Sequence, residues 1–100
     1  MDDRALSPEE IEGHLAELPG WTLVDGRLHR EYAFTDFSEA FGFMTRAALA
    51  AERLGHHPDW SNSFSRVTVD LTTHDAEGVT ELDVELAREM ETLSSGNGSS

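Results

Sequence analysis

The stretch TDFSEAFGFMTRAALAAERLG, Thr35 to Gly55, predicts a long central helix in this chain of 100 residues. Its apolar side chains recur at the three- and four-residue spacing of a helix with one buried face. They are Phe37, Ala40, Phe41, Met44, Ala47, Ala48, Ala51 and Leu54. Thr35 or Asp36 can cap the start of this helix, and Gly55 can end it after about Leu54.

A helix is also predicted near each end of the chain. Ser7 and Glu10 have the spacing of a capping box, in which each side chain bonds the backbone amide of the other, and Pro19-Gly20 would end that helix. The last helix opens at Thr80 and has an apolar stripe that fits one buried face. The stripe is Leu82, Leu86, Met90 and Leu93.

Two pairs of strands are predicted between these three helices. In the first pair, Trp21 to Val24 leads through the hairpin turn Asp25-Gly26 into Arg27 to Phe34. In the second pair, Phe64 lies in a strand, and a turn then leads to Val67 to Thr72, where apolar and polar side chains alternate.

The predicted order is therefore helix, two strands, helix, two strands, helix. This order is typical of an α+β domain in which a four-stranded antiparallel sheet has its three helices packed on one face. One domain over residues 1–93 accounts for all the apolar patterning, and the Gly/Ser-rich end, residues 94–100, is expected to be a disordered tail. The other sheet face and the sheet edges must then be solvated, charged or covered by another subunit.

The composition excludes several classes of function. Seven basic and 20 acidic residues give a formal net charge of -13, which disfavours direct binding to nucleic acid or to anionic lipid. The absence of cysteine excludes disulfides, thiolate nucleophiles and cysteine-based zinc sites. No signal peptide or membrane-spanning apolar run is recognisable, so a cytoplasmic location is the expectation.

Two adjacent histidines, His56 and His57, follow the predicted stop of the central helix in the stretch GHHPDWSN. His74 follows the last strand, so an antiparallel return could bring it close to them. Imidazole exchanges protons near neutral pH, and one ring can donate while another accepts. These three residues are the candidate catalytic groups, whereas His14 and His29 have the appearance of solvated residues.

Other interpretations remain open for these histidines. Adjacent histidines in a polar loop can simply be surface residues, and three imidazoles could ligate zinc, although neither HxH nor HExxH spacing is present. We therefore predict no metal site. The sequence also contains no GxSxG, GxxxxGK[ST] or GxGxxG motif, so we expect acid and base groups to act without a bound cofactor.

Three further residues have both a structural and a functional interpretation. Glu52, one turn before the helix stop, could reach the histidine loop or could be a solvated carboxylate. Trp60 could stack against a flat heterocycle or belong to the core. Asp83 has the spacing of a capping-box side chain relative to Thr80, and a capped helix end is also a rigid mounting point.

Taken together, Ala51-Glu52-Arg53-Leu54-Gly55-His56-His57-Pro58-Asp59-Trp60, then Leu71-Thr72-Thr73-His74, then Thr80-Glu81-Leu82-Asp83-Val84-Glu85-Leu86-Ala87 resemble the pterin-4a-carbinolamine dehydratase family. The resemblance covers the chain apart from its tail. It implies dehydration of 4a-hydroxytetrahydropterin to quinonoid dihydropterin, in the recycling of the tetrahydropterin that aromatic amino acid hydroxylases use. The resemblance assigns catalysis to His56, His57 and His74, and pterin binding to Glu52, Pro58, Trp60, Thr73 and Asp83.

The family also implies association into homodimers or homotetramers, and an aromatic amino acid hydroxylase is a possible partner. The alternative function is a protein-binding module without catalysis, a dimerisation cofactor or assembly factor of the same fold. The chain departs from the family where many relatives have W-x-N-V-Y-N, because it has Trp60-Ser61-Asn62-Ser63-Phe64-Ser65 there. Those changes fall on a strand and its turn, outside the histidines.

Overall fold

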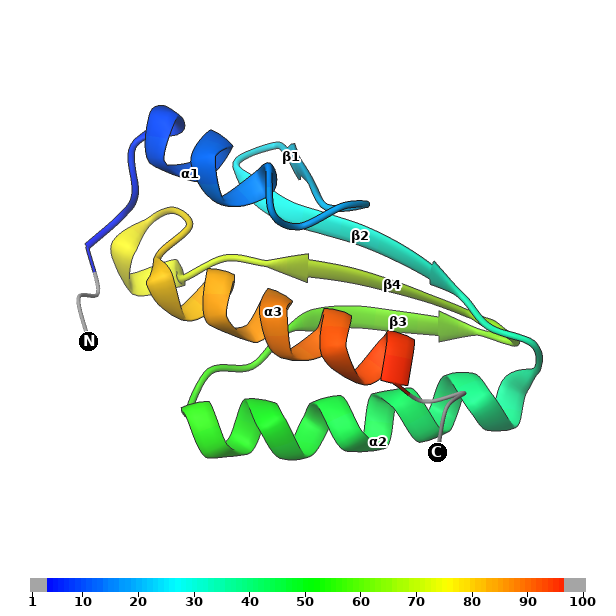
Figure 1. The fold of residues 1–100 in the computed structure, drawn as a ribbon. Coiled ribbons are helices and arrows are strands. Elements are labelled where there is room, and N and C mark those ends of the chain that lie inside the picture. The colour runs from blue at the N-terminus through cyan, green and yellow to red at the C-terminus, as the bar shows by residue number, and fades with distance from the viewer. Residues whose placement is uncertain (1–3, 97–100) are drawn as a thin grey trace.

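The computed structural model describes residues 4–96, and its element order is the predicted one (Figure 1). The helices and strands are α1 (Pro8–Leu15), β1 (Thr22–Val24), β2 (Arg27–Ala33), α2 (Phe37–Leu54), β3 (Asp59–Ser63), β4 (Arg66–Leu71) and α3 (Glu81–Gly96), with a 3₁₀ turn η1 (His74–Ala76) after β4. The expected α+β class is confirmed. No helix in the described part of the chain is long and apolar enough to cross a membrane.

The sheet is antiparallel throughout, with the strand order β1-β2-β4-β3. The two hairpins meet through β2 and β4, where Tyr32 pairs with Val67 and His29 pairs with Asp70. The three helices lie on the same side of this sheet (Figure 1). The opposite face has no covering element among the described residues.

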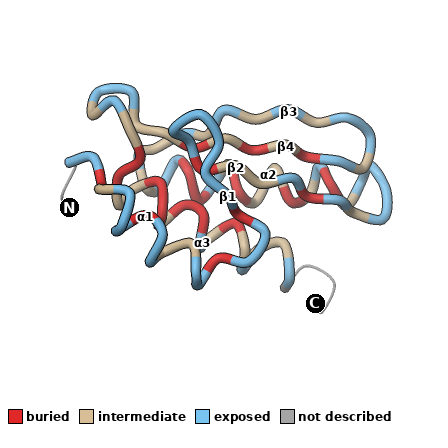
Figure 2. Tube along the Cα trace, turned by 90° about the horizontal axis from the view of Figure 1, so that it is seen from above, coloured by how far each residue is buried: buried red, intermediate tan, exposed pale blue. Residues whose placement is uncertain are grey.

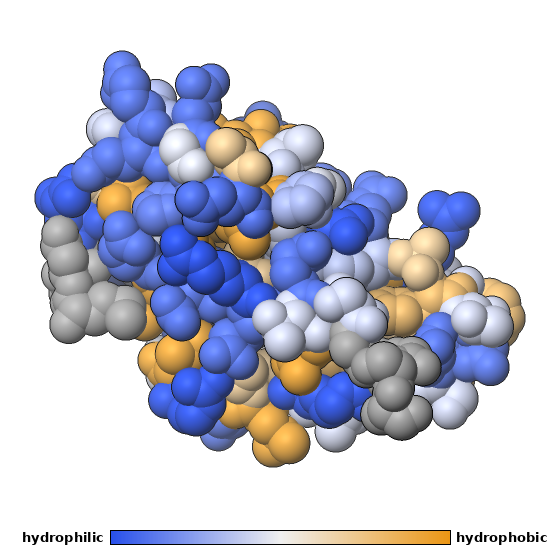
Figure 3. Space-filling model, viewed as in Figure 1, coloured by the Kyte–Doolittle hydropathy of each residue, from blue (hydrophilic) through white to orange (hydrophobic). Residues whose placement is uncertain are grey.

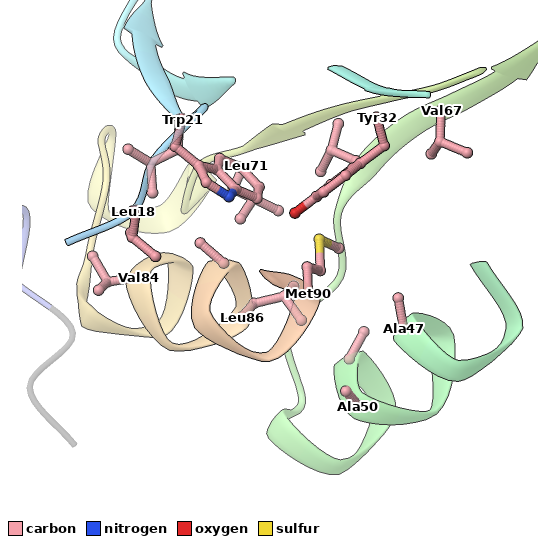
Figure 4. Packing of buried hydrophobic residues seen from close by; sticks show 14 of the residues in the cluster. Leu18, Trp21, Tyr32, Ala47, Ala50, Val67, Leu71, Val84, Leu86 and Met90 are labelled. Atoms are coloured by element: carbon pink, nitrogen blue, oxygen red, sulfur yellow. The ribbon is translucent and has the colours of Figure 1, made fainter. Parts of the chain in front are cut away.

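The core lies between the sheet and the helices, and β4 shows how the sequence pattern produces it. Val67, Val69 and Leu71 are fully buried, while the residues between them are half-buried on the other face. Phe43 of α2 packs into the same cluster. Met90 of α3 does so as well, beside Leu86 of the same helix (Figure 4). Figure 2 shows this burial along β4 and α3, whereas β3, at the sheet edge, has no fully buried residue.

The predicted helix starts and the Gly55 stop operate as expected, whereas α1 ends at Leu15, before the predicted stop at Pro19-Gly20. The Ser7 hydroxyl accepts a hydrogen bond from the Glu10 amide, and the Glu10 carboxylate accepts one from the Ser7 amide. Asp36 caps α2 through the Glu39 amide. Gly55 ends α2 with a φ of 66°, a left-handed conformation that glycine adopts without steric cost. This stop turns the chain toward the histidines.

Phe64 is not part of a strand, which corrects the sequence-based prediction. It lies in the turn between β3 and β4 with a φ of 54°, and β3 instead spans Asp59–Ser63. The Asn62 side-chain amide donates hydrogen bonds to the carbonyls of Phe64 and Arg66 at 3.0 and 2.9 Å, and so closes this turn. The local hydrogen bonds of an asparagine therefore outweigh the strand preference of an aromatic residue.

The last helix extends into the stretch that was expected to form a disordered tail. Ser94, Ser95 and Gly96 are the final residues of α3. The hydroxyls of Ser94 and Ser95 both donate hydrogen bonds to the Glu91 carbonyl at 3.0 Å, back to the preceding turn of the helix. The remaining tail residues, 97–100, lie outside the described residues.

Candidate functional site

Two loops at the same end of the sheet form a pocket of about 390 Å³. One loop follows the Gly55 stop of α2, and the other leaves β4 and enters η1 (Figure 1). The pocket is lined by Gly55, His56, His57, Pro58, Asp59, Thr72, Thr73, His74 and Asp75. The three histidines that the sequence singled out therefore meet at one pocket, although His74 is 17 positions from the nearest of the other two in the chain.

His56 is the most buried of the three, with a side chain that is 11% exposed. Its Nε2 forms a hydrogen bond with Oδ1 of Asp83, the third residue of α3. Asp83 is completely buried, so this contact ties the pocket loop to the helix layer. A buried carboxylate needs such partners because an unpaired charge in the interior is strongly unfavourable.

Asp83 has further partners on its second oxygen. Oδ2 accepts hydrogen bonds from the Thr73 hydroxyl at 2.8 Å and from the Thr80 amide at 2.9 Å. The latter contact confirms the predicted capping role of Asp83 at the start of α3. Asp83 has no exposed surface, so in this structure its connection to the pocket passes through His56 and Thr73.

His57 and His74 are exposed and each faces a carboxylate. His57 Nε2 lies 2.6 Å from Oε1 of Glu52, on the last turn of α2. His74 Nε2 lies 3.8 Å from Oδ2 of Asp59, the first residue of β3. Each histidine of the pocket thus has one acidic partner, and the two exposed rings are open to solvent and to a ligand.

Only some of the other predicted site residues line the pocket. Pro58 and Thr73 line the pocket, while Glu52 reaches it only through His57. Trp60 is not among the lining residues. It pairs with Val69 on the helix-covered side of the sheet and packs against the core, as the structural interpretation of this residue expected.

Sequence reasoning missed two polar contributors. Asp59 was quoted only as part of the motif, yet it lines the pocket and faces His74. Thr80 was noted only as a helix start, yet it is fully buried, and its hydroxyl lies 2.9 Å from that of Thr73. The signal for Thr80 was available, because a capping threonine three residues before a candidate site acid is bound to lie near it.

The two remaining histidines also depart from expectation, because neither is simply solvated. His29 and His14 side chains are each 25% exposed. His29 Nδ1 lies 2.9 Å from Asp70 on the open sheet face, and this hydrogen bond raises the pKa of His29. His14 lies 3.4 Å from Glu81 and contacts Arg88. Both are distant from the pocket in the chain and do not line it.

A larger groove, of about 690 Å³, lies near the other end of the sheet. It is lined by residues such as Arg30, Tyr32 and Ser94 but by no histidine. Behind it, the Glu91 carboxylate accepts hydrogen bonds from the Arg30 guanidinium and the Tyr32 hydroxyl, an arrangement that joins β2 to α3. The groove offers the carboxylates of Glu31 and Glu39 but no imidazole, so the smaller pocket remains the candidate site.

The site also does not resemble a preformed metal centre. Among residues 4–96, no three histidine or carboxylate side chains are grouped so as to hold a metal ion. The arrangement instead offers one buried, carboxylate-linked imidazole and two exposed imidazoles around a shared space. Such a set can give a proton to one atom of a ligand and take a proton from another.

Comparison with known proteins identifies the same stretch of chain. A family model described as pterin 4 alpha carbinolamine dehydratase matches residues 4–93. A protein from Solibacter usitatus, provisionally named as such a dehydratase, is 55% identical over 91 residues, which are 91% of this chain and 96% of that protein. A protein from Rhizobium rhizogenes with the same provisional name is 57% identical over 93 residues, 91% of this chain and 92% of that protein.

A solved structure agrees with the fold. The crystal structure of a protein from Brucella melitensis, described as a transcriptional coactivator/pterin dehydratase, superposes with a TM-score of 0.88 at 49% sequence identity. The match covers 91% of this chain and 99% of the Brucella chain. The family model, which matches residues 4–93, spans both loops of the histidine pocket.

Proposed function

Because this chain belongs to the pterin 4 alpha carbinolamine dehydratase family, we propose that it is a hydro-lyase that converts 4a-hydroxytetrahydropterin to quinonoid dihydropterin. The observation that carries the proposal is the meeting of His56, His57 and His74 at one pocket, each with a carboxylate partner. The reaction would serve the recycling of tetrahydropterin after an aromatic amino acid hydroxylase has oxidised it.

The reaction needs two proton transfers. The C4a hydroxyl must receive a proton so that the C–O bond breaks and water leaves. The N5–H bond must lose its proton so that its electron pair forms the C4a=N5 double bond. The substrate loses one water in total, no electrons are exchanged with the protein, and the protein needs only an acid and a base on the two sides of a flat ring.

The environments of the histidines support different roles for them. His56 is hydrogen-bonded to the buried Asp83 carboxylate and lines the pocket, so we propose His56 as the acid or hydroxyl-binding group. His57 and His74 are exposed at the mouth of the pocket, and we propose that one of them is the base at N5. Glu52 and Asp59 would orient these two rings.

The direct test follows the absorbance of enzymatically generated 4a-hydroxytetrahydropterin. The native chain is expected to accelerate its dehydration over buffer, and His56→Ala, His57→Ala and His74→Ala are each expected to reduce kcat about a hundredfold or more if that ring transfers a proton. His14→Ala is the matched control, because it removes a histidine of the same chain outside the pocket. Native protein that gives only the buffer rate would exclude the dehydratase function.

We propose that the protein forms homodimers or homotetramers, and exposed apolar side chains on α2 support this. Phe37, Phe41 and Leu49 are about half or more exposed, and the first two rings lie 5.7 Å apart. Figure 3 shows apolar residues on the surface over the part of the molecule where α2 lies. Sedimentation of native protein and of Phe41→Ser tests the association, and a monomer at micromolar concentration would contradict it.

The same surface would also serve the alternative function, a protein-binding module of this fold without catalysis. The two functions separate in one comparison. Phe41→Ser with full dehydration activity would place the surface outside catalysis, whereas native protein without activity would leave binding as the function of the fold. An aromatic amino acid hydroxylase is the partner that the proposed reaction favours, since it supplies the substrate.

A further inference from the structure

The completely buried Asp83 carboxylate is held by three hydrogen-bonding groups. Oδ1 faces His56 Nε2, and Oδ2 accepts from the Thr73 hydroxyl and the Thr80 amide. Thr80 is also completely buried, and its hydroxyl is 2.9 Å from the Thr73 hydroxyl. No buried polar side-chain atom in the described residues lacks a partner.

The hydrogen bonds of this network can be donated in only one consistent direction. A threonine hydroxyl has one hydrogen, and that of Thr73 is given to the Asp83 carboxylate. The 2.9 Å contact between the hydroxyls must then be a donation from Thr80 to Thr73. The Thr80 oxygen in turn accepts from the Leu82 amide at 3.3 Å, so the chain of donors begins at the backbone of α3 and ends at Asp83.

This direction determines the state of His56. As a carboxylate, Asp83 accepts both donors on Oδ2 and offers Oδ1 as an acceptor as well. His56 must therefore donate through Nε2–H. Its Nδ1 has no hydrogen-bond partner among residues 4–96, and His56 lines the pocket, so Nδ1 is the nitrogen left for a ligand.

We propose that Thr73 and Thr80 are positioning residues that orient Asp83 so that His56 is held with Nε2 protonated and Nδ1 available for proton transfer in the pocket. The catalytic part of this inference rests on the proposed dehydratase function, while the tautomer of His56 does not. If the two threonines had only a structural role, they would stabilise the start of α3 but would not determine which nitrogen of His56 carries the hydrogen.

Asp83→Asn gives the sharpest consequence. The Thr73 hydroxyl and the Thr80 amide both need an acceptor, so they would hold the amide oxygen of the new side chain on their side. Its NH₂ group would then point at His56 and donate to Nε2. His56 would be forced into the opposite tautomer, with the hydrogen on Nδ1, and could no longer take up a proton there.

The test is ¹H–¹⁵N NMR of the imidazole nitrogens in the full-length protein, with the His56 signals assigned by their loss in His56→Gln. The native protein is expected to show His56 with the hydrogen on Nε2, and Asp83→Asn to show it on Nδ1. In Thr73→Val the Nδ1–H fraction is expected to rise about tenfold, because one donor that fixes the carboxylate is lost. Thr73→Ser and Thr80→Ser retain the hydroxyl and are expected to keep the native tautomer.

Kinetics test the positioning in the proposed reaction. Thr73→Val is expected to lower kcat about tenfold with KM within about twofold of native, and Thr73→Ser to recover most of the loss. A folded Thr73→Val with native tautomer and native kcat would overturn the proposal, as would Asp83→Asn with the hydrogen still on Nε2. If Asp83→Asn does not fold, the Thr73 series decides alone. Native protein without dehydration activity but with the expected tautomers would refute the proposed function and leave the positioning intact.

Discussion

His29 and Asp70 join the two central strands on the open face of the sheet, with Nδ1 of the histidine 2.9 Å from Oδ1 of the aspartate. This hydrogen bond raises the pKa of His29, and Glu31 at 3.5 Å contributes in the same direction. Neither residue lines the histidine pocket, although Asp70 pairs across the sheet with Asp59, which does.

The sign of the resulting pH dependence follows from the raised pKa of His29. A histidine whose pKa is higher in the folded protein stabilises the fold fully below its unfolded value, about 6.5, and loses that contribution as the pH rises through the folded value. His29→Gln is therefore expected to cost up to about 1 kcal/mol at pH 5.5 and much less at pH 8.5. Urea unfolding at the two pH values checks this, and an equal cost at both would contradict it.

The Glu91 cluster is expected to be a major contributor to stability. Its Oε2 accepts from Trp21 Nε1, Arg30 Nε and the Tyr32 hydroxyl, which links β2 and the segment just before β1 to α3. Glu91→Ala leaves these donors without their acceptor and is expected to cost about 2–3 kcal/mol. The free energy of unfolding from urea titration measures the loss.

Glu89 provides the matched control on the same helix. It forms an ion pair with Arg53 at 2.9 Å, but the arginine side chain is 59% exposed. Glu89→Ala is expected to cost less than about 1 kcal/mol because solvent screens an exposed pair. Similar losses in the free energy of unfolding for Glu91→Ala and Glu89→Ala would show that the hydrogen bonds to Glu91 contribute no more than an exposed ion pair.

Much of this architecture could be predicted from local signals, because those signals act over a few residues. The capping pair Thr80 and Asp83 and the stop at Gly55 were recognisable from spacing and residue type, and the structure has both. Phe64 was misplaced because the side chain of Asn62 closes the turn. His29 was expected to be solvated because it is polar, and its partner Asp70 could not be recognised because it lies 41 positions away on another strand.

In the candidate site, too, contacts within one loop could be predicted from the sequence, whereas contacts between distant segments could not. The adjacent histidines and Asp59 belong to one loop and its following strand, so the sequence places them together. The hydroxyl chain from Thr80 through Thr73 depends on how η1 returns the chain to the start of α3, and residue spacing does not contain that geometry.

Gly20 is expected to be intolerant of a side chain. Its φ is 91°, and a Cβ atom there would lie 2.6 Å from the guanidinium of Arg30. That guanidinium is held by Glu91 and therefore cannot move aside freely. Gly20→Ala is expected to destabilise the protein by about 1–2 kcal/mol or more, from backbone strain and from the displaced arginine.

Gly13 is the corresponding control because a Cβ atom there meets nothing within 4 Å and the residue lies inside α1. Gly13→Ala is expected to stabilise the protein by about 0.5–1 kcal/mol, since alanine favours the helix. Thermal unfolding of both variants measures the difference. If Gly20→Ala left the stability unchanged, Arg30 would be able to move away from Glu91 at little energetic cost.

Phe64 combines a strained backbone with an exposed ring. Its φ is 54° and its exposed fraction is 69%, so in the isolated chain neither its conformation nor its packing is favourable. Phe64→Gly is expected to stabilise the monomer by up to about 1 kcal/mol by removing the left-handed strain. Chemical unfolding at low protein concentration measures this. A destabilised variant whose loss grows with protein concentration would instead show that the Phe64 ring is buried between copies of the chain.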